Sequence, residues 1–256
     1  MKKTLAVLAA VLSLSVHANE KLVVGATPVP HAEILAFVKP ALAAQGVDLD
    51  IKVFSDFIQP NLQLAEKNLD ANYYQYRPFL DEFNATRKTH LVPVVGVHIE
   101  PFGAYSTRIK NIAELKDGAS VAIPNDPVNA GRALVLLHEA GLLTLKDPSN
   151  TLATQRDIAD NPKHLKIREL EGALLARAVN QVDLAFVFAN YALEAGIDTN
   201  SALIVEKGKD LYVEFLVARP DNIDDPRVQK LAAALNSPQV REFILTRYKG
   251  EILPGF

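Results

Sequence analysis

The sequence predicts an α/β protein with two lobes, each built on a mainly parallel sheet flanked by helices. Strand-like and helix-like segments alternate along almost the whole chain, which is typical of such folds. The alternation starts again after Ser106, and no linker, internal repeat or low-complexity segment separates the two halves. We therefore expect two lobes joined by crossing strands.

The first half opens with an apolar segment, Lys21 to Ala26, that indicates a buried strand. Pro28 and Pro30 then lead into an amphipathic helix. Between residues 49 and 53 apolar and polar side chains alternate, which is the period of a strand. The expected order is strand 21–26, helix 31–45, strand 49–53, helix 60–68, strand 71–76, a helix from 78 and strand 92–99.

The second half continues the alternation and ends in two helices. We expect residues 19–105 and 212–256 to form lobe I and residues 106–211 to form lobe II, with hinges near Ser106 and Leu211. The expected order is strand 120–123, a helix ending at 141, strand 165–170, a helix from 172, strand 182–188, helix 190–195, strand 211–218 and helices 226–235 and 238–249.

The N-terminus indicates export. Lys2 and Lys3 precede an apolar run from Leu5 to Val16 that is too short to span a bilayer. The small residues that follow predict a signal peptide over residues 1–18, cleaved after Ala18. The chain contains no cysteine, so we expect no lipid-modified N-terminal cysteine and no membrane anchor.

Charge and motif content narrow the range of functions. The chain carries 27 Lys and Arg against 30 Asp and Glu, and this balance favours neither nucleic acid nor an anionic membrane as a partner. Its six histidines show no short metal-ligand spacing, and the glycine-rich motifs of phosphate and dinucleotide sites are missing, so we expect no metal and no cofactor. No G-x-S-x-G motif or paired acid and base stands out, which favours a non-enzymatic protein.

The segment from Ile123 to Arg132 is a candidate anion site. It joins a strand-like segment to a helix, with Asp126 placed to cap the helix and Pro127 in its first turn. Asn129 and Arg132 are three residues apart and share one helix face. Backbone N–H groups, an amide and a guanidinium therefore converge, and this combination suits a carboxylate. The competing interpretation is a plain helix start with an exposed arginine.

Aromatic residues in the first half suggest a pocket wall. Phe57, Tyr74 and Tyr76 stand at strand ends or in loops, where aromatic side chains often line sites for small amphipathic ligands. Tyr74 and Tyr76 point the same way if their segment is extended. The competing interpretation, a place in the core, is expected for at least half of the aromatic residues of this half.

Several motifs together resemble those of one family. They are Asp70–Leu80 (DANYYQYRPFL), His98–Pro101 (HIEP), Pro124–Arg132 (PNDPVNAGR), Asn161–Lys163 (NPK) and Asn190–Ala192 (NYA). Over essentially the whole mature chain the sequence resembles the methionine-binding (MetQ/NlpA) family of periplasmic components of ABC importers. The resemblance implies a type II-like, two-lobed periplasmic binding protein that closes over a free amino acid and docks on a permease with its ATPase.

The resemblance also implies roles for individual residues. Asn129 and Arg132 match the positions that hold the ligand carboxylate in the family. Tyr74 falls where the family usually has a Phe against the ligand side chain, and Phe57 falls where it usually has a Tyr.

Three positions depart from the family pattern. Tyr76 stands where the family commonly has His, and both Phe188 and Glu214 stand where a pocket Asn is common. If Glu214 faces the ligand, we expect it to form a charge-assisted bond to an ammonium group, because an unpaired buried carboxylate is costly. The competing interpretation turns Glu214 outward on its strand. These departures leave open whether the ligand is methionine, another amino acid or a dipeptide.

We therefore expect a monomeric periplasmic protein that binds an amino acid or a close derivative. The carboxylate is assigned to Arg132 and Asn129, and the amine is assigned to Glu214. The alternative is an exported enzyme that acts on a small carboxylate in the same cleft, with Glu214 as its candidate base. A structural role with a vestigial pocket is a third possibility. The side-chain wall is assigned to Tyr74, Tyr76, Phe57 and Phe188.

Overall fold

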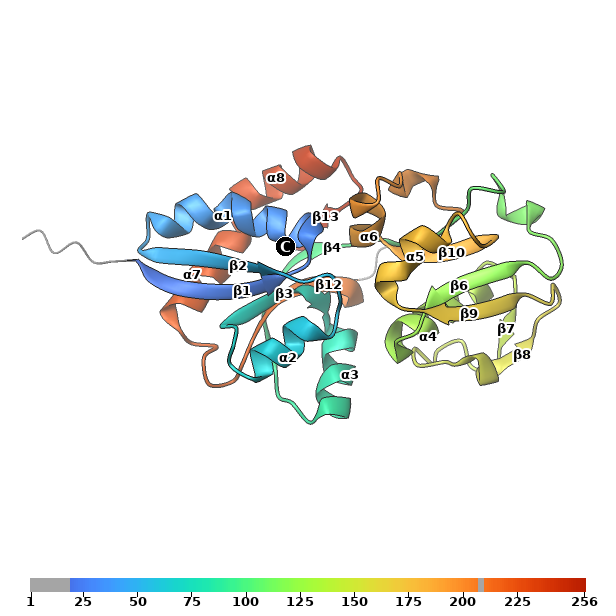
Figure 1. Ribbon diagram of the computed structural model, residues 1–256, viewed down its shortest axis with the longest axis horizontal. Helices are drawn as coiled ribbons and strands as arrows, with labels where there is room; N and C mark the ends of the chain where they lie inside the picture. Colours follow the sequence, from blue (N-terminus) through green and yellow to red (C-terminus); the bar gives the residue numbers. More distant parts are fainter. Residues whose placement is uncertain (1–18, 207–209) are drawn as a thin grey trace, which may run out of the picture.

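The computed structural model describes residues 19–206 and 210–256, so the signal peptide expected at 1–18 lies outside the described residues. The chain forms two lobes that lie side by side along the long axis of the molecule, each with its own sheet (Figure 1). This arrangement confirms the predicted two-lobed α/β fold. Among the described residues, no helix is long and apolar enough to cross a membrane.

Lobe I holds a six-stranded sheet with the strand order β13-β4-β12-β3-β1-β2. Helices α1, α7 and α8 pack on one face of this sheet around Leu22, Ile34 and Leu231, and α2 and α3 cover the other face around Leu64 and Leu80. Its elements are β1 (Glu20–Ala26), η1 (Pro28–Ala32), α1 (Glu33–Ala43), β2 (Val47–Val53), α2 (Gln59–Ala65), β3 (Ala71–Tyr76), α3 (Arg77–Arg87), β4 (Val92–Ile99), β12 (Val213–Ala218), α7 (Pro226–Leu235), α8 (Pro238–Tyr248) and β13 (Leu253–Pro254).

Lobe II holds a five-stranded sheet with the order β11-β5-β10-β6-β9 and a small β7-β8 ribbon. Its core gathers around Phe102, Ile123, Leu134 and Phe186. Its elements are β5 (Phe102–Tyr105), η2 (Ile112–Glu114), β6 (Ser120–Pro124), α4 (Pro127–Glu139), β7 (Thr144–Leu145), η3 (Gln155–Asp157), β8 (Ile158–Asp160), β9 (Lys166–Leu170), α5 (Gly172–Ala178), β10 (Leu184–Phe188), α6 (Ala189–Glu194), η4 (Thr199–Ser201) and β11 (Ile204–Val205).

Both sheets are mixed, which differs from the mainly parallel sheets expected. In lobe I, β1 pairs parallel with β2 and β3, whereas β12 pairs antiparallel with β3 and β4. In lobe II, β6 pairs parallel with β9 and β10, whereas β5 pairs antiparallel with β10 and β11. The antiparallel pairs involve the strands beside the crossings between the lobes, where the chain enters a sheet from the other lobe.

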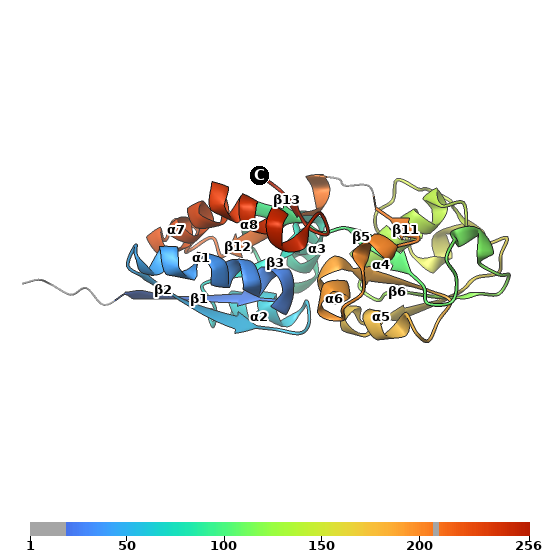
Figure 2. The ribbon, with the colours of Figure 1, turned by 90° about the horizontal axis from the view of Figure 1, so that it is seen from above.

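The chain crosses between the lobes twice, and the first crossing lies earlier than expected. Strand β5 was placed in lobe I, but it pairs with β10 and β11 in the sheet of lobe II. The crossing therefore follows β4 at Glu100-Pro101, because a strand belongs to the sheet that satisfies its backbone hydrogen bonds. After β11 in lobe II, the chain is next described at η5 (Asp210–Tyr212), which leads into β12 in lobe I. Figure 2 shows both lobes from above, with β12 lying in lobe I and β5 in lobe II.

Candidate functional site

A small cavity lies where the two lobes meet. Six of the seven residues predicted to bind a ligand line it, and the seventh, Arg132, lies next to it in α4. Its volume of about 20 Å³ is far smaller than an amino acid, so ligand entry requires the lobes or the lining side chains to move. The lining residues are Phe57, Tyr74, Gln75, Tyr76, Phe79, Glu100, Asn129, Phe188, Asn190 and Glu214.

The N-terminus of α4 supplies the lobe II side of the cavity. As the sequence predicts, Asp126 caps the helix by accepting from the backbone N–H of Asn129 at 3.0 Å, and Pro127 occupies the first turn. The side-chain amide of Asn129 donates to both oxygens of Asp126 at 3.0 Å. Its oxygen accepts a hydrogen bond from the hydroxyl of Tyr76 in lobe I. Asn129 is therefore buried and fixed from both lobes.

Arg132 is buried and paired, which contradicts the interpretation of an exposed arginine. Its Nε donates to Glu206 Oε1 at 3.0 Å, and its Nη2 donates to Glu206 Oε2 at 2.5 Å. The ring of Tyr212 stacks on the guanidinium, 3.8 Å from the central carbon, and Phe102 lies at 4.9 Å. The sequence analysis missed Glu206, because the pair spans 74 residues and no local pattern links its members.

An aromatic cluster closes another side of the cavity and joins the lobes. Phe57, in the loop before α2, stacks on Tyr191 at 5.0 Å and meets Phe188 edge-on at 5.3 Å, and both partners belong to lobe II. The hydroxyl of Tyr74 donates to the carbonyl oxygen of Phe57 at 2.8 Å. The hydroxyl of Tyr191 donates to the carbonyl of Ser55 at 3.0 Å. Tyr74 and Tyr76 both reach the cavity, as expected for alternate residues of β3.

Glu214 faces the cavity from β12 and is 6% exposed, so its side chain points inward. Its Oε2 finds no hydrogen-bond donor among the described residues. Burial raises the pKa of Glu214 well above its usual value, the negative charge of Glu100 raises it further, and the charge of Arg132 acts in the opposite direction. An unpaired carboxylate at this depth favours a cation beside it.

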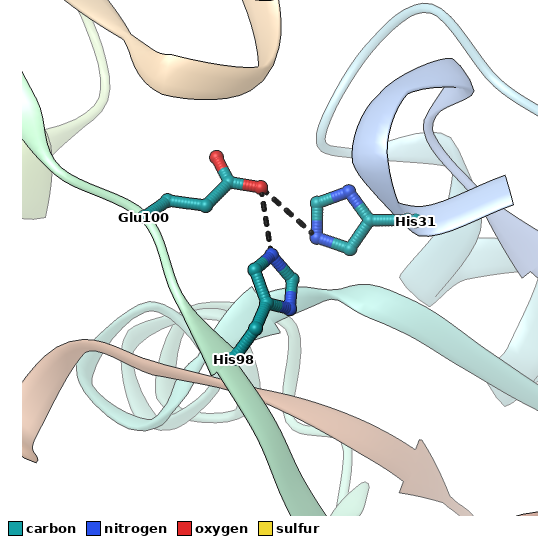
Figure 3. Close-up of side chains that lie close together, drawn as sticks. All are labelled: His31, His98 and Glu100. Atoms are coloured by element: carbon teal, nitrogen blue, oxygen red, sulfur yellow. Dashed lines mark hydrogen bonds and ion pairs between the residues drawn. The ribbon is translucent and has the colours of Figure 1, made fainter. Parts of the chain in front are cut away.

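Next to Glu214 lies a buried cluster that the sequence analysis did not foresee, shown in Figure 3. His98 Nε2 lies 3.0 Å and His31 Nε2 3.4 Å from the same oxygen of Glu100. The other ring nitrogens are held by hydroxyl groups, His98 Nδ1 by Tyr73 at 2.5 Å and His31 Nδ1 by Thr27 at 2.7 Å. Burial, and then the neighbouring His98, lower the pKa of His31 well below its usual value, so its ring is neutral at neutral pH.

The ligand atoms of His31, His98 and Glu100 lie within 4.8 Å of one another, close enough to hold a metal ion. No metal site was expected, because the two histidines are far apart in the sequence. Both ring nitrogens of His98 and Nδ1 of His31 make hydrogen bonds to neighbouring side chains. His31 Nε2 is the one ring nitrogen of the cluster that makes none with the described residues. The second oxygen of Glu100 accepts from the backbone N–H of Asn190 at 3.1 Å, which connects the cluster to lobe II.

Comparison with known proteins identifies the family. The NlpA lipoprotein model matches residues 22–256, nearly all of the described chain. The chain belongs to the NlpA lipoprotein family. A relative named as a probable D-methionine-binding lipoprotein MetQ, from Pasteurella multocida, is 38% identical over 93% of this chain and 87% of its own length.

Solved structures that are similar to this chain share its fold. A nutrient-binding protein from Burkholderia cenocepacia, solved bound to methionine, superposes with a TM-score of 0.88 at 37% identity, covering 92% of this chain and all of its own. A periplasmic substrate-binding protein of an ABC transporter from Coxiella burnetii gives a TM-score of 0.86 at 37% identity, covering 91% of this chain and 99% of its own.

Proposed function

We propose that this protein is the periplasmic solute-binding component of an ABC importer and that it binds an amino acid, methionine or a related compound, between its lobes. One observation carries the proposal. Side chains from separate segments of both lobes, spread from Phe57 to Glu214, line a single buried cavity. The relatives named as methionine-binding lipoproteins, and the related structure bound to methionine, support the same ligand class.

The cavity offers a different chemistry at each end. We assign the carboxyl end of the ligand to Arg132 and Asn129, at the start of α4. We assign the ammonium group to Glu214, whose free oxygen lacks a donor within the described part of the chain. Phe57, Tyr74, Tyr76 and Phe188 then surround the ligand side chain, which suits an apolar or aromatic group.

Binding proceeds by opening and closing of the lobes. Among the described residues, Glu100-Pro101 connects lobe I to lobe II and η5 leads back into lobe I, so a rotation needs few backbone changes. In the closed arrangement Tyr76 bonds to Asn129 and Tyr191 bonds to the backbone of Ser55 across the cleft. These contacts must break to admit the ligand and form again around it.

Export and delivery follow from the same assignment. Cleavage of the predicted signal peptide after Ala18 would release the mature chain into the periplasm. There the protein would deliver its ligand to a permease and its ATPase. The relatives are named lipoproteins, whereas the 256 residues of this chain contain no cysteine to carry a lipid. We accordingly propose that the lobes reach the permease without a cysteine-linked lipid.

Calorimetric titration of the mature protein tests the function. The panel contains L- and D-methionine, the other amino acids, methioninamide and methionyl dipeptides. We expect saturable binding of at least one of these ligands, with one ligand for each chain, and recovery of that ligand unchanged after incubation. Binding of none of them would refute the proposal. Conversion of the bound ligand would instead favour the alternative of an exported enzyme with Glu214 as its base.

A further inference from the structure

Glu206 holds one edge of the Arg132 guanidinium. Arg132 Nε donates to Glu206 Oε1 at 3.0 Å and to Oε2 at 3.1 Å, and Nη2 donates to Oε2 at 2.5 Å. Nη1 makes no hydrogen bond to Glu206, so the donors on the other edge of the guanidinium stay available. Both side chains are more than nine-tenths buried, and the charge of the carboxylate offsets that of the guanidinium when no ligand is present.

Aromatic rings limit the orientation of the same guanidinium. Its central carbon lies 3.8 Å from the ring centre of Tyr212, 4.9 Å from that of Phe102 and 5.1 Å from that of Tyr76. A planar guanidinium stacks well on such rings, and stacking keeps its plane fixed. Tyr212, the nearest of the three, therefore holds the plane of Arg132 in the closed arrangement.

The two partners of Arg132 are fixed by their own neighbours. The backbone N–H of Glu206 donates to the carbonyl oxygen of Phe102 at 2.9 Å, which continues the pairing of β11 with β5. Tyr212 directly precedes β12, and its ring meets the ring of Tyr76 edge-on at 5.2 Å. Glu206 therefore keeps its place with lobe II, and Tyr212 keeps its place with lobe I.

We propose that Glu206 and Tyr212 are positioning residues for the ligand carboxylate. Glu206 holds the Nε edge of Arg132 so that Nη1 is presented to the ligand, and the ring of Tyr212 fixes the plane of the guanidinium once the lobes close. This inference rests on the proposed function, in which Arg132 and Asn129 bind the carboxylate. It extends that function to two side chains that are not among those lining the cavity.

Holding the guanidinium in place strengthens binding through entropy and through geometry. A free arginine side chain samples many rotamers, and a ligand that must order it loses part of the binding free energy. Glu206 imposes that order in the ligand-free protein, and Tyr212 completes it on closure. A carboxylate also binds a guanidinium best in a bidentate geometry, which is lost when the arginine turns away. An amide group in the ligand depends less on this geometry, because it offers one uncharged oxygen.

The test compares L-methionine with L-methioninamide, which have nearly the same shape and differ in the carboxyl group. Both are titrated calorimetrically into the mature protein at about pH 6.5, below the pKa of ~7.7 usual for an α-amino group. If methionine does not bind, the tightest-binding amino acid of the panel and its amide take the place of this pair.

Glu206→Asp keeps the charge and shortens the side chain by about 1.5 Å. We expect this variant to bind methionine at least ~10-fold more weakly than the wild-type protein, a difference of ~1.4 kcal/mol, and to lose much less affinity for the amide. Glu139→Asp, at an exposed position of α4, is the matched control and should bind both compounds as the wild-type protein does.

Tyr212 is tested by a pair of substitutions. Tyr212→Phe keeps the ring and should bind methionine within about 2-fold of the wild-type affinity. Tyr212→Leu removes the ring and should bind methionine at least ~3-fold more weakly, with a smaller change for the amide. Recovery of affinity in the Phe variant separates the stacking of the ring from any effect of the hydroxyl group.

Each other outcome has a defined meaning. Unchanged or tighter binding of methionine by Glu206→Asp, or an equal loss for methionine and its amide, overturns the positioning role of Glu206. Glu206→Gln enters the same comparison if Glu206→Asp does not fold. Wild-type affinity in Tyr212→Leu, or equal losses in the two Tyr212 variants, overturns the role of Tyr212.

Two outcomes separate this inference from the proposed function. A wild-type protein that binds the amide as tightly as the free amino acid would remove the carboxylate from Arg132, and it would overturn the inference while leaving ligand binding intact. If no compound in the whole panel binds, the proposed function fails, and this inference fails with it.

Discussion

The hydroxyl of Tyr76 in β3 donates a hydrogen bond to the side-chain oxygen of Asn129 in α4, so one contact joins a central strand of lobe I to a cavity-lining helix of lobe II. Both side chains line the cavity and both are at least nine-tenths buried. Asn129 in turn donates to Asp126, the cap of α4. Closure of the lobes and the orientation of the candidate carboxyl site therefore depend on the same amide.

Tyr76→Phe should weaken ligand binding by about 1–3 kcal/mol, because the buried oxygen of Asn129 then loses its donor in the closed arrangement. Calorimetry with the tightest ligand of the panel measures the effect. Tyr248→Phe is the matched control, since it removes a hydroxyl that bonds to Glu33 at 2.9 Å within lobe I. The control should lower stability without changing affinity. Equal affinities of Tyr76→Phe and the wild-type protein would show that this contact does not contribute to closure.

Arg132→Met should cost about 3–5 kcal/mol of unfolding free energy, because it leaves the carboxylate of Glu206 buried without a cation. Adding Glu206→Leu removes that carboxylate and should restore most of the stability. Ligand affinity should remain reduced by about 2–4 kcal/mol in both variants, since the guanidinium is missing in each. Urea unfolding and calorimetry separate the two effects. Wild-type affinity in the stable double variant would remove Arg132 from the binding site.

The stability of the ligand-free protein should depend on pH through two buried groups that act in opposite directions. The pKa of Glu214 is raised in the folded state, so the unfolded chain releases this proton first and stability falls as the pH rises above about 4.5. The pKa of His31 is lowered, so the unfolded chain binds this proton first and stability falls as the pH drops below about 6.5.

Glu214→Gln separates these two contributions. The variant should have a higher melting temperature than the wild-type protein at neutral pH. It should still lose stability on acidification, because His31 causes that loss. Thermal unfolding of the variant and the wild-type protein between about pH 4.5 and 8 measures both slopes. Melting curves that keep the same difference at every pH would show that Glu214 does not titrate in this range.

Local patterns in the sequence were sufficient for much of the fold and the site. The cap at Asp126 and the proline after it were recognised because they act within one helical turn. Tyr74 and Tyr76 were placed on the cavity side because alternate residues of a strand face the same way. Comparison with the family pattern singled out Glu214, which the periodicity of β12 alone would not distinguish from its neighbours.

Features that depend on contacts between distant segments were missed. Nothing near Arg132 in the sequence indicates Glu206, and nothing near His31 indicates His98 or Glu100. The assignment of β5 to the wrong lobe has the same origin, because the partners of a strand are decided by segments far along the chain. Sequence analysis therefore supplied six residues that line the cavity but not the pairing of charged side chains beside it.

Gly131 lies between the two candidate carboxyl-binding residues of α4 and leaves no room for a larger side chain. A Cβ atom at this position would lie 2.2 Å from the carbonyl oxygen of Thr151 and 3.0 Å from the backbone nitrogen of Ala153. Since those are backbone atoms, Gly131→Ala must shift α4 or the segment against it, at a cost of about 1–3 kcal/mol. Because α4 carries Asn129 and Arg132, affinity should fall together with stability.

Glu139→Ala, at an exposed position near the end of α4, is the control and should change neither by more than about 0.5 kcal/mol. Full stability and affinity in Gly131→Ala, measured by urea unfolding and calorimetry, would show that α4 can move away from residues 151–153 without disturbing the site.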